Sequence, residues 1–411
     1  MKILFVVSYP PSLIRVRPYN LIRFLTARGH QVTVQTLYSN AREQQEVEAL
    51  RKYCHTVEAF PMPRWHSMWN CLRALPSRVP LQAVYSWQPR LAQHMAASIQ
   101  EGNYDVVHIE HLRGARYGLH LLKEFDKNGQ RIPVIWDSVD CISLLFRWAS
   151  ERSQKLISRL LTRLEVERTR EYERWLPGQF DQVLVTSPVD RQALLDLAPP
   201  GCPATKISVL SNGVDLDYFT PGAAEKREAA TLVVSGKMSY HANVAMVGYL
   251  VQQIMPHIWG ARPDVHLQIV GKKPPREILA LGENPSISVI SDVPDIPPYL
   301  QRATVALTPI LYGVGVQNKV LEAMACATPV VATPQAVSAL QVKAGEEVYV
   351  AQEPESFAAA VLRLLAAPLE RERLGQAGRT YVEQHHHWAS IAQQLEEVYM
   401  HALERYPGVI L

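Results

Sequence analysis

Short apolar runs and longer amphipathic stretches alternate along most of the chain. Residues 2–8 form an apolar run typical of a strand, residues 17–28 have the spacing of an amphipathic helix, and residues 31–37 have the pattern of another strand. Parallel strands read as continuous apolar runs because helices cover both faces of their sheet. Further strands are expected at residues 106–109, 134–136, 182–186, 231–235, 265–270, 286–290, 304–307 and 330–331. The pattern predicts an α/β fold.

The alternation of strands and helices occurs in two halves. A chain of 411 residues is too long for one ordinary hydrophobic core, so two domains are expected. In the second half, residues 243–258 have the pattern of a helix between two strands, and a final helical pattern covers about residues 388–406. No sequence repeat is visible, so the two doubly wound halves should share an architecture only.

Composition and charge narrow the class of protein. The chain is 47% hydrophobic and 20% charged, which is typical of a soluble globular protein. Its net charge of +3 does not indicate a nucleic-acid-binding protein. Its cysteines are scattered without a C-x-x-C pair, which favours a reducing compartment and argues against zinc. No apolar run approaches the roughly 18 residues of a membrane span. A cytoplasmic protein is expected.

Residues 315–333, G-V-Q-N-K-V-L-E-A-M-A-C-A-T-P-V-V-A-T, carry the strongest local signal. They predict a loop, a helix and a short strand. Gly315 lets the backbone turn closely, and Pro329 is expected to stop the helix. Lys319 and Glu322 are three residues apart, so they share a helix face near the helix N-terminus.

This arrangement matches the chemistry of a nucleotide diphosphate. A helix N-terminus offers free N–H groups and a positive dipole end, which suit phosphate. Lys319 adds a full positive charge, and the Glu322 carboxylate can accept the hydroxyls of a ribose. The alternative is a surface helix with an ordinary ion pair three residues apart.

Two motifs then point to a family. Residues 206–221, K-I-S-V-L-S-N-G-V-D-L-D-Y-F-T-P, resemble the interdomain linker of retaining glycosyltransferases of family 4, which have the GT-B architecture. The N-K-V-L-E-A-M-A helix resembles the donor-site helix of that family. The pattern looks closest to the branch of bacterial sugar transferases associated with exopolysaccharide export.

The resemblance implies a domain plan. GT-B proteins have two Rossmann-like domains that face a central cleft, and their C-terminal helix crosses back to the first domain. Residues 1–212 would form the acceptor-side domain, with residues 386–411 packing on it. Residues 213–385 would bind the nucleotide sugar.

The resemblance also assigns a donor site. It comprises Gly236, Lys237, Gly271, Val316, Gln317, Asn318, Lys319 and Glu322. Lys237 stands where the family usually has arginine, with an ordinary solvated lysine as the alternative. The family's second basic residue is absent, since Asn243 lies near its position, and Lys319 is expected to replace it. Gly271 would form a turn under the base, or be a generic loop glycine.

One residue departs from the family pattern. The family's signature has two glutamates, and Glu322 matches the second, whereas the first falls on Val314. The first glutamate helps to orient the donor sugar, so the usual sugar contacts are in doubt. Gln317 or Asn318 would serve instead, in a G-x-x-N-K variant of the motif.

In the first domain, residues 105–111 read D-V-V-H-I-E-H, and the family carries histidines at this strand end. Glu110 and His111 are therefore catalytic candidates beside Lys237 and Lys319. His111 is expected in the loop after the strand. His108 shares a strand face with Glu110, and a buried, satisfied histidine is the alternative for both histidines.

Four more polar residues of the first domain are candidates for substrate contacts. Arg15 and Arg17 replace part of a glycine-rich loop and could meet a phosphate of the acceptor or donor, or form a solvated face. Asp137 and Asp140 follow another strand and could face the acceptor.

A metal-binding motif and a membrane-binding surface are two further possibilities that the sequence raises. Asp215 and Asp217 resemble a metal-binding D-x-D, but Asp215 is expected to bond local backbone. No cofactor and no metal is therefore expected. Residues 60–87 are rich in tryptophan, and residues 152–163 hold Arg152, Lys155, Arg159 and Arg163 without an acid. Such a basic amphipathic helix suits the anionic inner leaflet of a membrane, whereas a core-packed helix is the alternative.

Together these features predict a retaining glycosyltransferase. It would move a sugar from a nucleotide-diphosphate sugar to a glycan or lipid-linked acceptor in bacterial polysaccharide biosynthesis. It would be cytoplasmic, and peripheral on the inner membrane if the basic helix binds lipid. Two alternatives stay open: an epimerase or hydrolase of sugar nucleotides, and a non-catalytic member of an assembly complex, because Val314 replaces a glutamate.

Overall fold

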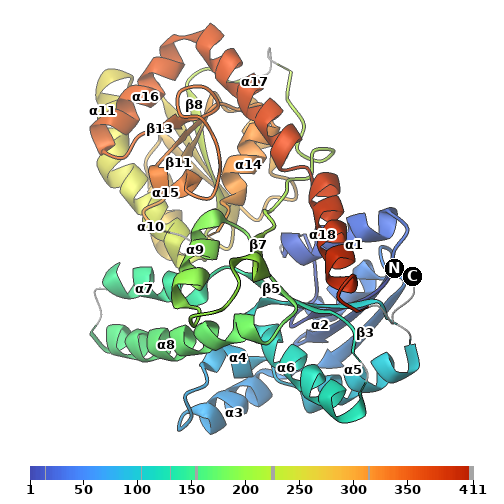
Figure 1. The fold of residues 1–411 in the computed structure, drawn as a ribbon. Coiled ribbons are helices and arrows are strands. Elements are labelled where there is room, and N and C mark those ends of the chain that lie inside the picture. The colour runs from blue at the N-terminus through green and yellow to red at the C-terminus, as the bar shows by residue number, and fades with distance from the viewer. Residues whose placement is uncertain are drawn as a thin grey trace. The chain divides into compact units, whose positions relative to one another are not determined.

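The computed structural model divides into two compact units (Figure 1). Unit 1 comprises Met1–Ser211 and Trp388–Leu411, and unit 2 comprises Asn212–His387. These boundaries lie within two residues of those expected from the sequence. The structure describes residues 1–13, 15–102, 104–129, 131–152, 156–223, 227–312 and 315–406, and the side chains of residues 149–163 are outside this description.

Unit 1 is built on a parallel sheet in the order β3-β2-β1-β4-β5-β6-β7. Its strands are β1 (Lys2–Val7), β2 (Gln31–Tyr38), β3 (Thr56–Pro61), β4 (Val106–Glu110), β5 (Val134–Val139), β6 (Gln182–Val185) and β7 (Ile207–Val209). Its helices are α1 (Val16–Ala27), α2 (Ala41–Leu50), α3 (Arg64–Ala74), α4 (Leu81–Tyr85), α5 (Pro89–Gly102), α6 (His111–Asn128), α7 (Ile142–Arg152), α8 (Leu156–Trp175), α9 (Pro188–Leu197) and α18 (Trp388–Leu403). The strand order reverses between β1 and β4, which makes this a doubly wound sheet.

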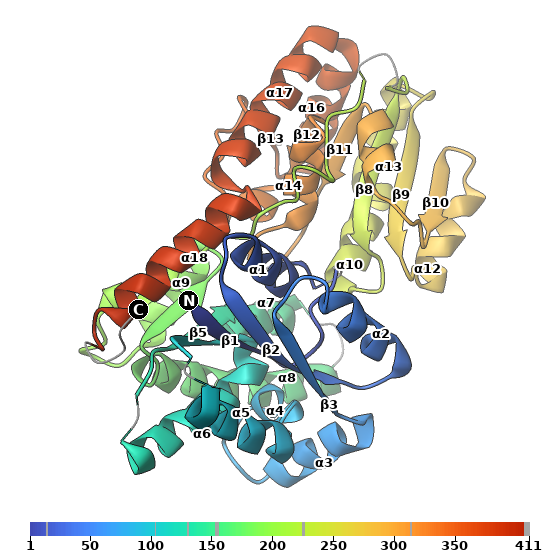
Figure 2. The same ribbon diagram turned by 90° about the vertical axis from the view of Figure 1, so that its right-hand side faces the viewer.

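The C-terminal helix α18 packs on unit 1, as the family resemblance implied. Figures 1 and 2 both place it beside α1. Its apolar side chains Trp388, Ile391 and Leu395 join the buried cluster that includes Phe5 of the central strand. Glu396 on the same helix accepts a hydrogen bond from Arg28 at 2.7 Å. The helix ends at Leu403, three residues before the end that its sequence pattern predicted.

Unit 2 is built on a second parallel sheet in the order β10-β9-β8-β11-β12-β13. Its strands are β8 (Thr231–Lys237), β9 (His266–Lys272), β10 (Ile287–Ser291), β11 (Val305–Thr308), β12 (Val330–Ala332) and β13 (Tyr349–Val350). Its helices are α10 (His241–Tyr249), α11 (Met255–Ala261), α12 (Arg276–Leu279), α13 (Pro297–Arg302), α14 (Asn318–Ala325), α15 (Pro334–Val337), α16 (Pro354–Ala366) and α17 (Pro368–His385). Two Rossmann-like sheets confirm the predicted fold class.

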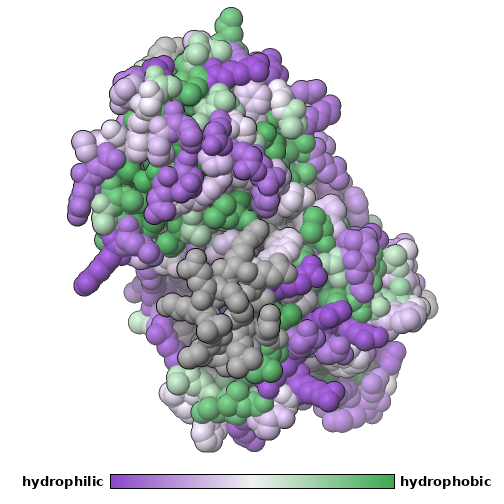
Figure 3. Space-filling view, turned by 90° about the vertical axis from the view of Figure 1, so that its left-hand side faces the viewer, coloured by the Kyte–Doolittle hydropathy of each residue, from purple (hydrophilic) through white to green (hydrophobic). Residues whose placement is uncertain are grey.

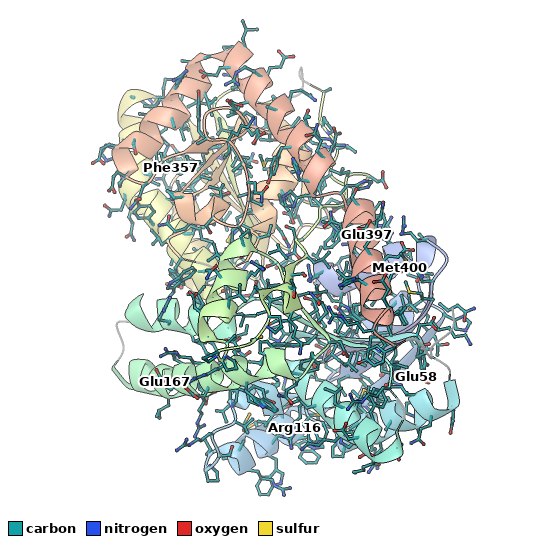
Figure 4. The ribbon with its side chains drawn as sticks, in the orientation of Figure 1. Glu58, Arg116, Glu167, Phe357, Glu397 and Met400 are labelled. Carbon is teal, nitrogen blue, oxygen red and sulfur yellow. The ribbon has the colours of Figure 1, made fainter. Side chains whose placement is uncertain are left out.

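Helices cover the second sheet with their apolar faces inward. Phe357 of α16, labelled in Figure 4, is fully buried in the core of unit 2. Over α11 and α16 the outer surface in Figure 3 is mainly hydrophilic, with smaller apolar areas between. Burial of one helix face and hydration of the other is what the amphipathic pattern of the chain predicted.

The single helix expected at residues 243–258 is wrong in detail. The chain forms α10, then a π-helical turn η4 (Leu250–Ile254), and then α11. Pro256 is in the first turn of α11. Proline lacks an N–H and its ring clashes with the carbonyl four residues earlier, so a regular α-helix cannot continue through this position.

Candidate active site

Ligands of doubly wound sheets bind at the carboxyl ends of the strands, where the strand order reverses. In unit 2 this point lies between β8 and β11. Gly236 and Lys237 are the last residues of β8, and the chain runs from β11 through a loop into α14. The expected donor-site residues therefore gather at the edge of the sheet that this fold uses for ligands.

Two glycines bring the backbones of β8 and β9 close together at this edge. Gly236 pairs with Gly271 in the sheet register. A Cβ atom on Gly271 would lie 1.8 Å from the carbonyl oxygen of Gly236, which no side chain permits. Gly271 is the last residue but one of β9, so it lies at a strand end and is not a loop glycine, and its place under a base stays a prediction. Gly236 has φ +149°, a conformation that favours glycine.

Lys319, Asn243 and Lys237 form a hydrogen-bonded group beside Gly236. The Lys319 ammonium donates to Asn243 Oδ1 at 2.7 Å, and Asn243 Nδ2 donates to the Lys237 carbonyl oxygen at 2.9 Å. A Cβ on Gly236 would lie 3.5 Å from Lys319 Cε. An ammonium has three donors, so within the described residues two donors of Lys319 are available to a ligand.

Burial shifts the pKa values of Lys319 and Glu322. Burial lowers the pKa of Lys319 to about 8, against the opposing effect of Glu322. Burial also raises the pKa of Glu322 to about 7, against the opposing effect of Lys319. Among the described residues no ion pair joins the two, so they do not form the exposed pair that was the alternative for this helix.

The helix α14 begins at Asn318 and carries Lys319 in its first turn, as predicted. Gly315 has φ +67°, which the approach to the helix requires. Gln317 is the N-cap residue, and Val316 before it is buried. Within the described chain, the buried Oδ1 of Asn318 has no hydrogen-bond partner. Val314, where a glutamate was expected, lies outside the described residues.

Pro329 does not end α14, contrary to the prediction. The helix ends at Ala325, and Ala327 adopts a left-handed conformation with φ +52°. The amide of Thr328 bonds the Ala323 carbonyl, and the amide of Ala327 bonds the Met324 carbonyl. These two bonds form a Schellman motif, with alanine where glycine is usual. The predicted strand β12 follows.

Lys237 lies at the exposed end of β8. No ion pair to Lys237 occurs among the residues that the structure describes. Its position beside Gly236 and Asn243 leaves its ammonium free to approach an anion at the same edge. The solvated-lysine alternative and the diphosphate role are both compatible with this exposure.

In unit 1, Glu110 ends β4 and His111 begins α6, with no loop between them. The expectation that His111 lies in a loop was therefore wrong. His111 has φ +66°, a strained conformation of the kind that clusters at functional sites. Burial and nearby Arg113 lower the pKa of His111 to about 3, so the imidazole is neutral.

Glu110 is 2% exposed and hydrogen-bonds the Tyr9 hydroxyl. Burial, assisted by the charge of Asp137, raises the pKa of Glu110 to about 8. Its Oε2 has no hydrogen-bond partner within the described residues. Glu110 is therefore a protonated, buried acid near neutral pH in this structure.

Arg17, His108 and Asp137 form an internal cluster. The Arg17 guanidinium donates to Asp137 Oδ2 at 2.8 Å, and both side chains are buried. His108 Nε2 lies 3.5 Å from the same oxygen, and its Nδ1 lies 2.8 Å from the Tyr399 hydroxyl. Asp137 therefore does not face an acceptor, and Arg17 does not lie on a solvated face. His108 is the buried histidine that was its alternative.

The remaining candidate residues lie in unit 1 and in the linker. Asp215 Oδ1 accepts from the amides of Asp217 and Tyr218, which confirms its local role. Asp140 is half-buried and accepts from Thr186 Oγ1 at 3.2 Å. The side chains of Arg152, Lys155, Arg159 and Arg163 lie outside the described residues. In the described chain no helix is both long and apolar enough to cross a membrane.

Sequence reasoning missed what Asn243 does. It was noted only as the replacement of a basic residue, whereas its side chain connects Lys319 to the end of β8. A second missed pair is His241 and Tyr312, whose Nδ1 and hydroxyl lie 2.8 Å apart. Residues 243 and 319 are 76 positions apart, so local spacing carries no signal for this contact.

Family models agree with the fold. Residues 15–218 match the model described as Glycosyltransferase Family 4. Residues 229–367 match the model described as Glycosyl transferases group 1. The two matches fall on the two units. The chain is therefore a glycosyltransferase with the GT-B fold.

Individual proteins give the same class. The MMP alpha-(1->4)-mannosyltransferase of Mycolicibacterium hassiacum is 30% identical over 214 residues, which are 49% of this chain and 49% of that protein. The match thus spans about half the length of this curated relative. Sucrose-phosphate synthase from Thermosynechococcus elongatus has a TM-score of 0.69 at 18% identity, over 98% of this chain and 99% of that one.

A second solved structure is HepE from Anabaena in complex with UDP and glucose. It has a TM-score of 0.68 at 15% identity, over 97% of this chain and 99% of that one. At these identities the two solved structures show that the fold is shared from end to end.

Proposed function

We propose that this chain transfers a sugar from a nucleotide-diphosphate sugar to a glycan or lipid-linked acceptor, with retention at the anomeric carbon, in bacterial polysaccharide biosynthesis. One observation carries the proposal. Lys319, held by Asn243 beside the bare backbone of Gly236, lies at the strand edge where this fold binds nucleotides. The family matches define the reaction class, and this group of residues suits the donor.

The proposed chemistry depends on charge. In a retaining transfer the leaving diphosphate must be stabilised on the face where the acceptor attacks. Lys237, Lys319 and the N-terminus of α14 would supply that electrostatic stabilisation, which often contributes more to catalysis than any other effect. A bound diphosphate would raise the pKa of Lys319 above about 8, because it stabilises the ammonium.

Glu322 would hold the nucleotide by its ribose. It lies one turn after Lys319 on the same helix face. Its carboxylate would accept the ribose hydroxyls, which replace part of the hydration that burial removes.

The relatives indicate which donors to test first. The curated relative is named a mannosyltransferase, and HepE was solved with UDP and with UDP-glucose. Nucleotide-linked hexoses are therefore the first candidates. A thermal-shift screen should find the donor base, because a ligand at 100 times its dissociation constant stabilises by about 2.7 kcal/mol.

We also propose that the transfer needs no metal ion, because the two lysines would neutralise the diphosphate. Activity should persist in excess EDTA. Complete loss in EDTA, restored by magnesium or manganese, would show that a metal carries the diphosphate instead.

The exposed face of α3 supports an acceptor at a membrane surface. Trp65, Met68, Trp69 and Leu72 have the spacing of one helix face and are between 54% and 68% exposed. Figure 2 shows α3 on the outside of unit 1. Residues 59–100 contain four arginines and no acidic residue. An apolar stripe within a cationic stretch suits an anionic lipid surface.

Co-sedimentation with anionic vesicles tests this part of the proposal. Replacing Trp65 and Trp69 with serine should weaken binding, whereas Leu279→Ser, an exposed apolar residue of unit 2, is the control. Replacing Arg152, Lys155, Arg159 and Arg163 with glutamine tests the basic stretch. If the wild type does not bind such vesicles at low salt, the acceptor is not presented by a membrane.

Labelled nucleotide sugars test the reaction itself. Transfer of label to a membrane extract supports the proposal, and the anomeric configuration of the product tests retention. Isomerisation of the donor, or release of free sugar without an acceptor, would instead identify an epimerase or hydrolase. Nucleotide binding without turnover would identify a non-catalytic protein.

A further inference from the structure

Unit 1 contains a polar pocket of about 220 Å³ that the donor chemistry does not use. Its walls come from the ends of β1 and β2 and from helices α2, α3, α4 and α6. The residues that matter for its chemistry are Ser8, Arg15, Glu43, Arg64, Ser67 and Arg113. The pocket lies at the carboxyl ends of the strands, beside the point between β1 and β4 where the strand order reverses.

The pocket carries an excess of positive charge. Arg15, Arg64 and Arg113 line it, and Glu43 is the single acidic residue in its wall. Arg15 is already committed to Glu43 at 2.7 Å and lies over the Tyr9 ring. Among the described residues, Arg64 and Arg113 form no ion pair with a carboxylate. Two guanidinium groups therefore face the pocket without a counter-ion from the part of the chain that the structure describes.

Two polar atoms in the wall also lack a partner in the described chain. Ser8 is more than nine-tenths buried, and its hydroxyl has no hydrogen-bond partner there. The Nε of Arg113 is likewise buried and without a hydrogen-bond partner among these residues, although its guanidinium lies over the Tyr85 ring at 5.2 Å. Leaving a buried donor unpaired costs about 1–3 kcal/mol, so such atoms point to a ligand that pairs with them.

We propose that this pocket binds a phosphate group of the acceptor, held by Arg64, Arg113 and the Ser8 hydroxyl. A phosphate monoester carries a charge of about −1.5 to −2 and strong acceptor oxygens, which match two free guanidinium groups and a hydroxyl. This inference rests on the proposed function and names the acceptor class: a phosphorylated sugar or alcohol, or a phospholipid-type headgroup.

The helix α3 connects the pocket to the surface. Arg64 and Ser67 of α3 line the pocket, and the adjacent face of the same helix carries the exposed apolar stripe of Trp65, Met68, Trp69 and Leu72. A phosphate in the pocket would therefore lie beside a surface that accepts an apolar chain. This arrangement fits a phosphate that carries a lipid, and the free phosphate is the second source to be tested.

Calorimetry with inorganic phosphate and with glycerol 1-phosphate tests the pocket. Arg64→Gln and Arg113→Gln should each weaken binding at least tenfold, because each removes a charged donor. Arg90→Gln, an exposed arginine of α5 outside the pocket, is the matched control and should bind as the wild type does. Neutral glycerol should not bind. Equal binding of glycerol and glycerol 1-phosphate, or unchanged affinity in both pocket variants, would overturn the proposal.

Ser8→Ala separates a ligand role from a structural one. The hydroxyl has no partner within the described protein, so its removal should not lower the thermal unfolding midpoint but should weaken phosphate binding several-fold. Unchanged phosphate binding in this variant would remove Ser8 from the site. Vesicles with and without phosphatidic acid distinguish the lipid source from the soluble one, and binding to neither vesicles nor glycerol 1-phosphate would refute both.

The donor site needs its own control because it too is expected to bind phosphate. Phosphate binding should survive Lys319→Gln and be lost in Arg113→Gln, whereas nucleotide binding should show the reverse. Intact nucleotide binding with no phosphate binding to the pocket would refute only this inference. Phosphate binding without any transfer activity would refute only the proposed function.

Discussion

The two sheets of this protein have the same plan but opposite chemistry at their carboxyl edges. In unit 1, the main charges at the strand ends pair internally: Arg17 pairs with Asp137, and His108 lies between Asp137 and Tyr399. In unit 2, the edge has two glycines, and among the described residues the hydrogen-bond partner of the Lys319 ammonium is the neutral side chain of Asn243. The first edge therefore contains a charge paired by a hydrogen-bonded counter-ion, whereas at the second edge no ion pair to Lys319 occurs among the described residues.

The difference separates structural ionisable groups from functional ones. A buried charge with a hydrogen-bonded counter-ion stabilises the fold only weakly, but losing its partner is costly, so such a pair is retained without any ligand. A cation that is half-buried beside bare backbone and has no counter-ion is better explained by an anionic ligand. By this criterion we expect a ligand of unit 1 to bind in the polar pocket lined by Arg64 and Arg113, and not at the cluster of Arg17, His108 and Asp137.

The largest expected effect is that of Lys319→Ala. Removing the cation should reduce transfer by roughly 10²–10³-fold, the range found for loss of one electrostatic stabiliser of a transition state. Lys343→Ala, an exposed lysine of the same unit, should have no such effect. Steady-state kinetics measure both. A decrease of less than about tenfold would place the Lys319 cation outside the transition state and remove the contrast between the two edges.

Gly271→Ala tests the close approach of β8 and β9. The new Cβ would lie 1.8 Å from the Gly236 carbonyl oxygen, so the strands must separate. We expect a loss of unfolding free energy of about 1–3 kcal/mol or more. Gly248→Ala in α10 is the control, since a Cβ there meets no atom within 4 Å and alanine favours a helix. Urea titrations measure the unfolding free energy of both variants. Equal values for Gly271→Ala and Gly248→Ala would show that the close approach of β8 and β9 does not require glycine at position 271.

Nucleotide affinity should have a narrow pH optimum. The Glu322 carboxylate forms as pH rises through about 7, and the Lys319 ammonium is lost as pH rises through about 8. Affinity should therefore be highest between these values. Glu322→Gln should remove the rise and weaken binding by about 1–3 kcal/mol. Lys319→Arg should remove the fall, because a guanidinium stays protonated. Calorimetry between about pH 6 and pH 9 measures the nucleotide affinity of the wild type. An affinity that did not change with pH would exclude the roles assigned to Glu322 and Lys319.

Much of the fold could be predicted because its signals are local. The strands β1, β2, β8 and β9 contain short apolar or alternating stretches, and the predicted ends of each lie within two residues of the observed ends. The edge strand β3 was missed because Val57 is its one fully buried residue, so it shows no apolar run. The π-turn before Pro256 was missed because the helical periodicity continues through it.

The candidate site was predictable only where its residues are close in sequence. Lys319 and Glu322 lie one turn apart, so their shared helix face follows from spacing. Arg17 and Asp137 are 120 residues apart, and no local pattern indicates that they pair. Whether a residue has a structural or a functional role depends on partners that are distant in sequence. For this reason the sequence did not show that Asp137 pairs with Arg17, or that Asn243 binds Lys319.

The last prediction concerns the carboxyl edge of the sheet in unit 1 and uses Glu110. Its pKa is raised to about 8 in the folded protein from 4.5, so between these values the folded state keeps a proton that the unfolded state has lost. The stability that this proton contributes is complete below pH 4.5 and is lost as pH rises through about 8. The slope is at most about 1.4 kcal/mol per pH unit.

Glu110→Gln has no such proton, so its stability should fall less steeply with pH than that of the wild type, and it should be the more stable of the two near pH 8. Glu167→Gln on α8, an exposed glutamate labelled in Figure 4, should keep the wild-type slope. Urea titrations at several pH values measure all three proteins. If Glu110→Gln and the wild type had the same slope, Glu110 would be ionised in the folded protein. It would then be an ionised carboxylate at a strand end. The carboxyl edge of the sheet in unit 1 would then present a charged group to a ligand, as the edge in unit 2 is proposed to do.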